Sequence, residues 1–328
     1  MTSKDINWYI QGVRDNNRKI LAKTITLIES SLPDHREMGR HIVDRLLPHT
    51  GKGIRLGVTG VPGAGKSTFI ESLGIYLIGK GHRVAVLAVD PSSSRSGGSI
   101  LADKTRMEKL SASPIAFIRP SPSGGTLGGV ADKTRETMLL CEAAGFDVVI
   151  IETVGVGQSE TAVSSMVDFF LVLLIAGAGD ELQGIKKGVL ELADAIAINK
   201  ADGNNIKAAE MARSEYESAL HILRPISPSW SPPVMTCSSI ETSGIENIWN
   251  TVLLHREKMG CTGEFDERRK RQAVEWMWSM VNSSLREWFT ANPLVREILP
   301  GITRDGERGS LEPTVAASKL LFFLKDKT

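Results

Sequence analysis

The segment from Gly60 to Ser67 reads GVPGAGKS and fits the pattern GxxxxGK[ST]. Glycines at these positions let the backbone amides turn inward and hold phosphate oxygens. Lys66 is spaced to reach the β- and γ-phosphates of a nucleotide, and the Ser67 hydroxyl is spaced to bind magnesium. An apolar run comes before the segment and a helical pattern after it, so a phosphate-binding loop is expected. The predicted contacts are Gly60, Val61, Pro62, Gly63, Ala64, Gly65, Lys66, Ser67 and Thr68.

A second motif, Asn199-Lys200-Ala201-Asp202, follows a predicted strand and matches the NKxD sequence with which GTPases read guanine. The Asp202 carboxylate can accept hydrogen bonds from the ring N–H and the exocyclic amine of guanine. Adenine lacks this pair of donors, and a buried polar group left unpaired costs about 1–3 kcal/mol or more. Cys237-Ser238-Ser239 resembles the second base-contacting loop of GTPases. We therefore expect GTP rather than ATP, contacted by Asn199, Lys200, Asp202, Cys237, Ser238 and Ser239.

Two acidic residues end predicted strands. Asp90 follows the run Val84–Val89, and Glu152 follows Val148–Ile151. Both are expected to face the nucleotide, because ligands bind at the carboxyl ends of strands in parallel sheets. Glu152 stands where the usual DxxG motif has Asp, so it is expected close to magnesium, with the Gly155 amide at the γ-phosphate. Either acid, taken alone, could instead cap a helix or lie in a solvated turn.

Two charged loops bounded by glycines come next. Residues 99–106 carry Asp103, Lys104 and Arg106, and residues 177–188 read GAGDELQGIKKG. Loops of this kind can be ordered by a γ-phosphate and released after hydrolysis, although solvated loops are the alternative. Val156 stands after Gly155 in place of the glutamine that positions water in many GTPases, so slow intrinsic hydrolysis is expected.

Short apolar runs alternate with helical segments through the middle of the chain. Many are apolar at consecutive positions, as in strands covered on both faces. This alternation predicts an α/β fold with a doubly wound, mostly parallel sheet. The expected strands are Ile54–Thr59, Val84–Val89, Ile115–Ile118, Val148–Ile151, Phe169–Ile175, Ala195–Ile198 and Val234–Thr236. Helical extensions are expected at both ends: two helices separated by Pro33 in the first 50 residues, and helices beyond Ile245.

Bulk composition excludes several classes of function. The formal net charge is +1, so no global field attracts nucleic acid or a membrane. Three scattered cysteines indicate neither a disulfide framework nor a zinc site and fit a reducing cytoplasm. The apolar run Phe169–Ala178 is too short to cross a bilayer.

The basic run Arg268–Arg271 is flanked by acids and is interpreted as a solvated helix face. Trp276, Trp278 and Trp288 are interpreted as core residues or dimer-interface anchors.

Five stretches together resemble the MeaB/ArgK/MMAA family of P-loop GTPases, which is related to the metal-insertion chaperones. They are GVTGVPGAGKST, AVDPSSSRSGGSILADKTRM, ETVGVGQSE, GDELQGIKKG and INKAD. The resemblance covers essentially the whole chain and points to the enterobacterial ArgK-like branch. It implies a homodimeric chaperone for adenosylcobalamin-dependent methylmalonyl-CoA mutase, in which GTP binding and hydrolysis gate cofactor delivery and protect the mutase.

The resemblance also implies roles for particular residues. Catalysis would rest on Lys66, Asp90 and Glu152, and magnesium would be held by Ser67, Asp90, Asp103 and Glu152. A switch that senses the mutase would contain Arg106, Asp180, Gln183, Lys186 and Lys187. Residues 1–50 would form a helical extension, 51–258 the GTPase domain, and 259–328 a helical dimerisation arm.

Two rival functions stay open at this point. The ArgK branch has been labelled a transport-system kinase, but the sequence identifies neither an acceptor pocket nor a base. Related GTPases insert nickel, but no two of the six histidines lie within three or four residues of each other, so no helical ligand pair exists.

Overall fold

The computed structural model describes residues 5–89, 107–120, 127–153, 159–177, 187–222 and 227–325. These residues divide into two compact units, Met1–Gln272 and Ala273–Thr328. None of the helices in the described ranges is long and apolar enough to cross a membrane.

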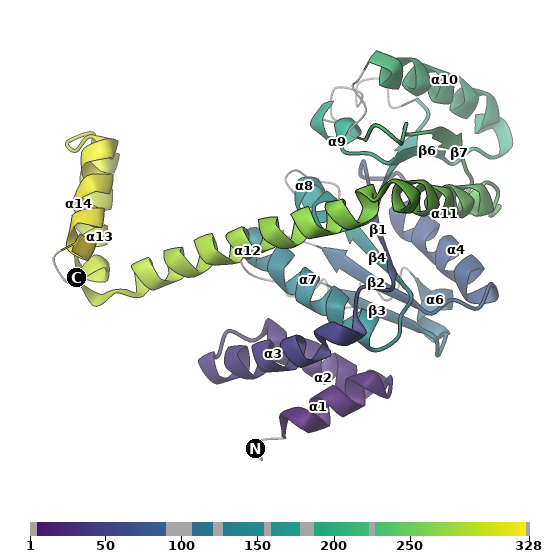
Figure 1. Ribbon diagram of the computed structural model, residues 1–328. Helices are drawn as coiled ribbons and strands as arrows, with labels where there is room; N and C mark the ends of the chain where they lie inside the picture. The colour runs from purple at the N-terminus through teal and green to yellow at the C-terminus, as the bar shows by residue number, and fades with distance from the viewer. Residues whose placement is uncertain are drawn as a thin grey trace. The chain divides into compact units, whose positions relative to one another are not determined.

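The described strands of the first unit form one parallel sheet in the order β3-β2-β4-β1-β5-β6-β7 (Figure 1). The strands are β1 (Ile54–Gly60), β2 (Val84–Val89), β3 (Ala116–Pro120), β4 (Val148–Thr153), β5 (Phe169–Ile175), β6 (Ala195–Asn199) and β7 (Val234–Thr236). The chain runs from β1 toward one edge of the sheet and later toward the other. The carboxyl ends of β1, β4 and β5 therefore meet at the point where ligands bind in open α/β sheets.

Helices cover both faces of the sheet, which confirms the predicted doubly wound α/β fold. One face buries Val58 and Ile150 against α4 (Lys66–Gly79), α6 (Glu108–Ala112) and α11 (Ile245–Thr262). The other face buries Ile151 and Val172 against α7 (Leu127–Ala143), α8 (Ser159–Ser164) and α10 (Ile206–Ile222). Successive residues of a strand point to opposite faces, so strands covered on both sides are apolar throughout. The short segments α9 (Lys187–Glu191) and η3 (Gly203–Asn205) flank β6.

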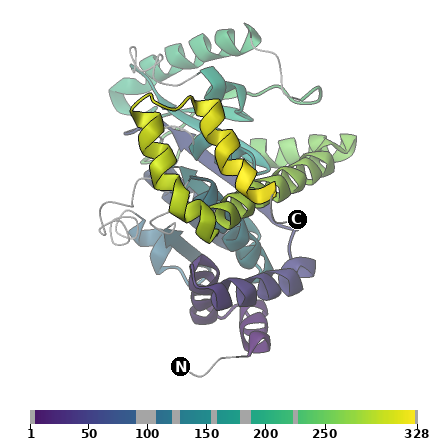
Figure 2. The same cartoon turned by 90° about the vertical axis from the view of Figure 1, so that its left-hand side faces the viewer.

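Three helices precede the sheet among residues 5–50, so the prediction of two was wrong. They are α1 (Ile6–Arg14), α2 (Arg18–Glu29) and α3 (Pro33–Leu46), followed by the 3₁₀ turn η1 (Leu47–His49). Pro33 begins α3, where a missing N–H costs nothing. The unpredicted break lies at Asn16, with φ 56°, and at Asn17, whose side chain caps α2. Both views show these helices gathered together, and α2 and α3 pack on α7 (Figures 1 and 2).

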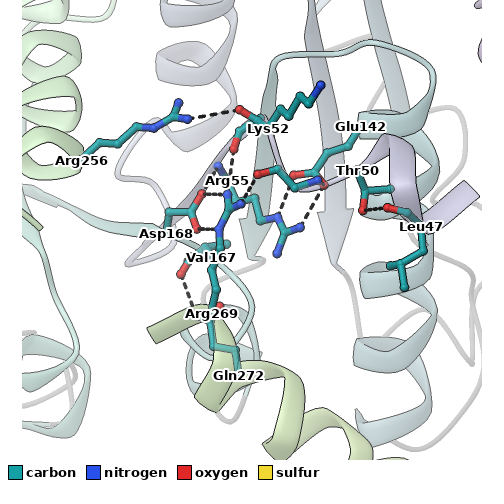
Figure 3. A network of polar contacts seen from close by, with 12 residues as sticks. Leu47, Thr50, Lys52, Arg55, Glu142, Val167, Asp168, Arg256, Arg269 and Gln272 are labelled. Carbon is teal, nitrogen blue, oxygen red and sulfur yellow. Dashed lines mark hydrogen bonds and ion pairs between the residues drawn. The ribbon is translucent and has the colours of Figure 1, made fainter. Parts of the chain in front are cut away.

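The basic run in α12 (Glu264–Ala291) is not a solvated face throughout, which corrects the sequence interpretation. The Arg269 guanidinium donates to both carboxylate oxygens of Asp168, at 2.8 and 2.7 Å, and to the carbonyl of Gly53 at 2.8 Å (Figure 3). The Asp168 carboxylate also accepts from the backbone N–H of Arg55 at 2.9 Å. The Arg55 side chain in turn forms a bidentate pair with Glu142 of α7 at 2.8 and 2.9 Å. The start of α12 is therefore bound to the amino ends of β1 and β5.

The second unit contains the rest of α12 together with α13 (Pro293–Glu307) and α14 (Pro313–Lys325), which pack on each other. Trp278 and Trp288 are 57% and 59% exposed, so of the two interpretations, core residues or dimer-interface anchors, these two do not fit the first. The apolar face of α12 contains a hollow of about 570 Å³. Its lining is Ala273, Trp276, Met277, Met280, Val281, Ser284, Leu285 and Trp288.

Candidate nucleotide-binding site

The predicted phosphate loop joins the carboxyl end of β1 to the first turn of α4. Lys66 is buried, and its ammonium donates to the carbonyls of Gly60 at 2.9 Å and Val61 at 3.2 Å. The loop's own backbone thus orients the cation. The first turn of α4 has no side-chain cap and no acidic residue. Its amides and the positive end of the helix dipole are therefore suited to an anionic ligand.

Two glycines of the loop have a positive φ and lie close to atoms of neighbouring strands. Gly60 has φ 150°, and a Cβ there would lie 2.1 Å from the carbonyl oxygen of Leu173 on β5. Gly65 has φ 84°, and a Cβ there would lie 2.9 Å from the amide nitrogen of Asn199. Any larger residue at either position would displace the loop from β5 or from Asn199. The glycine pattern is thus explained by packing as well as by phosphate binding.

An acidic residue approaches the loop from the neighbouring strand. Glu152, near the end of β4, pairs in register with Val58 of β1 and is nearly buried. Its Oε1 accepts a hydrogen bond of 2.9 Å from the Ser67 hydroxyl. Magnesium prefers oxygen ligands and keeps several waters, so an adjacent hydroxyl and carboxylate fit this ion. At the same ends of β1 and β4, the hydroxyls of Thr59 and Thr153 are 2.7 Å apart.

Asn199 connects the phosphate loop to the predicted guanine loop. Its side-chain N–H donates to the carbonyl of Ala64 at 2.8 Å. Its Oδ1 accepts from the backbone N–H of Ser239 at 3.2 Å and from the Ser239 hydroxyl at 2.9 Å. Asn199 is 1% exposed, so these groups have little water as an alternative partner. The amide therefore holds two separate loops in one fixed arrangement.

Asp202 and Ser238, two of the residues expected to contact guanine, are in contact with each other. The Ser238 hydroxyl donates to Oδ2 of Asp202 and accepts from the backbone N–H of Glu241 at 3.1 Å. Lys200, between the two motif residues, is exposed and has φ 60°. Its carbonyl accepts from the Asn205 side chain at 2.7 Å, which stabilises this unusual conformation.

Cys237 is the first residue of the base-contacting loop and is buried. Its side chain is 1% exposed, and Sγ is 3.6 Å from Oδ1 of Asn199. Burial raises the pKa of the Cys237 thiol to about 12. The group therefore stays protonated near neutral pH and acts as a weak donor to Asn199. The described geometry thus makes the side chain of Cys237 a support for Asn199.

Several predicted site residues fall outside the described parts of the chain. These are Asp90, Asp103, Arg106, Gly155, Asp180, Gln183 and Lys186. Lys187 is the first residue of α9, and its side chain is not among those described. Sequence reasoning also missed Ser72 of α4, whose hydroxyl donates to the carbonyl of Ser239 at 2.6 Å. A lone serine on a helix outside any motif gives no signal by which it could have been found.

The chain is similar to several known proteins. The family model described as "Methylmalonyl Co-A mutase-associated GTPase MeaB" matches residues 21–294. The chain is 52% identical to "GTPase ArgK" of Escherichia coli, over 86% of both chains. It is 45% identical to the mitochondrial "Methylmalonic aciduria type A homolog" of Mus musculus, over 96% of this chain and 79% of that one. A crystal structure titled "LAO/AO transport system kinase" is 41% identical, with a TM-score of 0.78, covering 98% of this chain and 97% of that one.

Proposed function

Because the chain belongs to the family of methylmalonyl-CoA mutase-associated GTPases and is itself a GTP hydrolase, we propose that it is a switch that serves the mutase. In this proposal it acts as a chaperone for an adenosylcobalamin-dependent methylmalonyl-CoA mutase. Binding and hydrolysis of GTP would time cofactor loading and protect the mutase from inactivation. The names of the matching family and of the mouse relative support this partner.

The observation that carries the nucleotide part is the position of Asn199. One amide holds both Ala64 of the phosphate loop and Ser239 of the base-contacting loop. A ligand that bridges these loops must have a phosphate chain at one end and a base at the other. Asp202 presents a carboxylate at the base end, and a carboxylate pairs with the two adjacent donors of guanine.

The chemistry at the phosphate end follows from three side chains. Lys66 would place its charge at the β- and γ-phosphates, with its orientation set by Gly60 and Val61. The Ser67 hydroxyl and the Glu152 carboxylate, whose oxygens are 2.9 Å apart, would hold a magnesium ion. Asp90 and Asp103 are the further expected ligands. A bound magnesium ion would neutralise charge on the phosphate oxygens. Gly155 would offer its amide to the γ-phosphate.

The residues proposed to transmit the nucleotide state are Arg106, Asp180, Gln183, Lys186 and Lys187.

We propose that the arm of residues 259–328 forms a homodimer through the apolar face of α12. Exposed Met277, Trp278, Leu285 and Trp288 support this assignment, because a large apolar patch on a soluble chain marks an interaction surface.

The nucleotide part is tested by hydrolysis of γ-labelled GTP, with ATP as the comparison and Lys66→Ala as the inactive control. We expect magnesium-dependent release of free phosphate from GTP and little from ATP. Label that appears on a protein or small-molecule acceptor would indicate a kinase and contradict the proposal.

The partner is tested by size-exclusion chromatography with a purified adenosylcobalamin-dependent mutase. We expect the amount of complex to differ between GDP and a non-hydrolysable GTP analogue, and we expect Lys66→Ala to remove that difference. An equal amount of complex in every nucleotide state would contradict the role of a switch. Tight stoichiometric binding of nickel in equilibrium dialysis would instead indicate a metal-inserting GTPase.

A further inference from the structure

Ser72 forms a hydrogen bond that is unusual for a helical serine. It lies in α4, between the buried residues Ile70 and Leu73, and is itself half-buried. Hydroxyls in helices often bond to the carbonyl four residues earlier, as Ser218 of α10 does to Ser214 at 2.9 Å. The Ser72 hydroxyl donates instead to the carbonyl of Ser239, 167 residues away in the chain, at 2.6 Å.

This bond closes a ring that starts and ends at the phosphate loop. Ala64 accepts from the side chain of Asn199 at 2.8 Å. Asn199 accepts from the hydroxyl of Ser239 at 2.9 Å, and Ser239 accepts from Ser72 at 2.6 Å. Ser72 then returns to the loop through the first turns of α4, which begins at Lys66. The base-contacting loop is thus held from both sides by the element that holds the phosphates.

The loop that carries Ser238 and Ser239 is exposed beyond these two buried residues. Ile240, directly after Ser239, is 79% exposed. The neighbouring bonds of Ser238, to Ser243 at 3.0 Å and to Glu241 at 3.1 Å, stay within the loop itself. Ser239 is placed from outside the loop by Asn199, which accepts from its N–H and hydroxyl, and by Ser72, which donates to its carbonyl. Ser238, on that loop, contacts the carboxylate of Asp202.

We propose that Ser72 is a positioning residue for guanine recognition, which keeps the loop of Ser238 and Ser239 aligned with Asp202. The inference rests on the proposed guanine-reading role of Asn199, Asp202 and Ser238. Ser72 contacts neither base nor phosphate in this proposal and acts only through Ser239. Its loss should weaken binding of the base without changing the chemistry at the γ-phosphate.

The test compares Ser72→Ala with Ser72→Thr, which keeps the hydroxyl, and with Ser218→Ala as the matched control. The measurements are the KM and kcat for GTP, ITP and ATP, the dissociation rate of fluorescent GDP, and the melting temperature. For Ser72→Ala we expect about a 3- to 10-fold higher KM for GTP and a similarly faster release of GDP. A change of this size corresponds to the loss of about one neutral hydrogen bond. The kcat should stay within about twofold, because Lys66 and Ser67 keep their places.

The relative effects on GTP, ITP and ATP distinguish a positioning role of Ser72 from a general destabilisation of the protein. ITP lacks the exocyclic amine, so Ser72→Ala should reduce the preference for GTP over ITP, while KM for ATP stays unchanged. Ser72→Thr should restore the wild-type values, and Ser218→Ala should not differ from wild type. Wild-type KM and GDP release in Ser72→Ala would overturn the inference, as would an equal loss for GTP, ITP and ATP. A wild-type protein without preference for GTP over ATP would overturn the guanine site itself, and this inference with it.

Discussion

The guanidinium of Arg268 faces the carboxylate of Asp194 through two hydrogen bonds of 3.0 and 2.9 Å. Asp194 directly precedes β6, and its Oδ2 also accepts from the backbone N–H of Phe170 on β5 at 2.8 Å. His255 of α11 approaches the same carboxylate, with Nε2 3.6 Å from Oδ1. The start of α12 is therefore bound to the amino ends of β5 and β6 through one buried acid.

This acid should make folding stability depend on pH in the acidic range. Burial alone would raise the pKa of Asp194, but Arg268 and His255 outweigh burial and hold that pKa below its ordinary value. A lowered pKa in the folded state stabilises the protein above the unfolded pKa, about 3.9 for aspartate, and this contribution is lost as pH falls through the folded pKa. In urea unfolding from pH 7 to pH 3, Asp194→Asn should be less stable than wild type at pH 7. The difference in unfolding free energy between the two proteins should shrink below about pH 4. A difference independent of pH would contradict a lowered pKa for Asp194.

The neighbouring pair of Asp168 and Arg269 should matter at neutral pH. Their side chains are 5% and 17% exposed, and Asp168→Asn would leave the guanidinium without its countercharge. Breaking a buried ion pair by removing one partner costs about 3–5 kcal/mol. We expect a loss of this order in the free energy of unfolding, measured with urea. Glu267→Gln is the control, because its partner Lys270 lies on the same helix and that pair is 73% and 71% exposed. The control should change stability by less than about 1 kcal/mol.

The strands could be predicted from the sequence, whereas these two ion pairs could not. The runs Val84–Val89, Phe169–Ile175 and Val234–Thr236 were predicted with the bounds that the structure shows, because a strand buried on both faces leaves an apolar run in the sequence. The four basic residues from Arg268 were read as solvent-facing, because charge on a helix is usually exposed. The partners of Arg268 and Arg269 lie 74 and 101 positions earlier in the chain, and no local pattern links residues at that distance.

The candidate site shows the same division. The phosphate loop and NKxD are contiguous motifs with a fixed spacing, so Lys66, Ser67 and Asp202 could be named from the sequence alone. The role of Cys237 as a buried support depends on a contact between β6 and the loop after β7, and the bond from Ser72 to Ser239 depends on a contact between α4 and that loop. Tertiary contacts of this kind carry no signature in a single sequence. The missed break at Asn16 differs, because it does have a local signal: asparagine tolerates a left-handed φ, here 56°, and Asn17 is a common type of helix N-cap.

Replacing Asp202 should change which base the protein prefers. Asp202→Asn would offer an amide N–H where the carboxylate accepts, while its carbonyl could still accept from Ser238. Xanthine has a carbonyl in place of the exocyclic amine of guanine and would pair with that N–H. We expect GTP binding to weaken by roughly 10- to 100-fold, because charge-assisted hydrogen bonds to guanine are lost. We expect XTP binding to improve. Competition of GTP and XTP against fluorescent GDP measures both. Unchanged preference for GTP would remove Asp202 from the base site.

Replacing Asn199 should affect both loops at once. Asn199→Ala would leave the carbonyl of Ala64 and the hydroxyl of Ser239 without their partner, at about 1–3 kcal/mol for each buried group. Asn199→Asp would keep the acceptor for Ser239 but place a carboxylate against the Ala64 carbonyl. We expect both variants to release GDP faster than wild type, with the phosphate loop disturbed in each. If Asn199→Asp released GDP at the wild-type rate, the bond to Ala64 would not be what connects the two loops.

The apolar face of α12 should determine the oligomeric state. Leu285 and Trp288 line the hollow on this face and are 56% and 59% exposed in the single chain. A second copy of the chain would remove this surface from water, at about 25 cal/mol for each Å² of apolar area buried. We expect wild type to sediment as a dimer, and Leu285→Glu and Trp288→Glu to sediment as monomers that still hydrolyse GTP. Met211→Glu is the control, because Met211 of α10 is 67% exposed and lies in the other unit. Dimers that persist in both α12 variants would place the interface elsewhere, since a buried glutamate pair at the two-fold contact would not be tolerated.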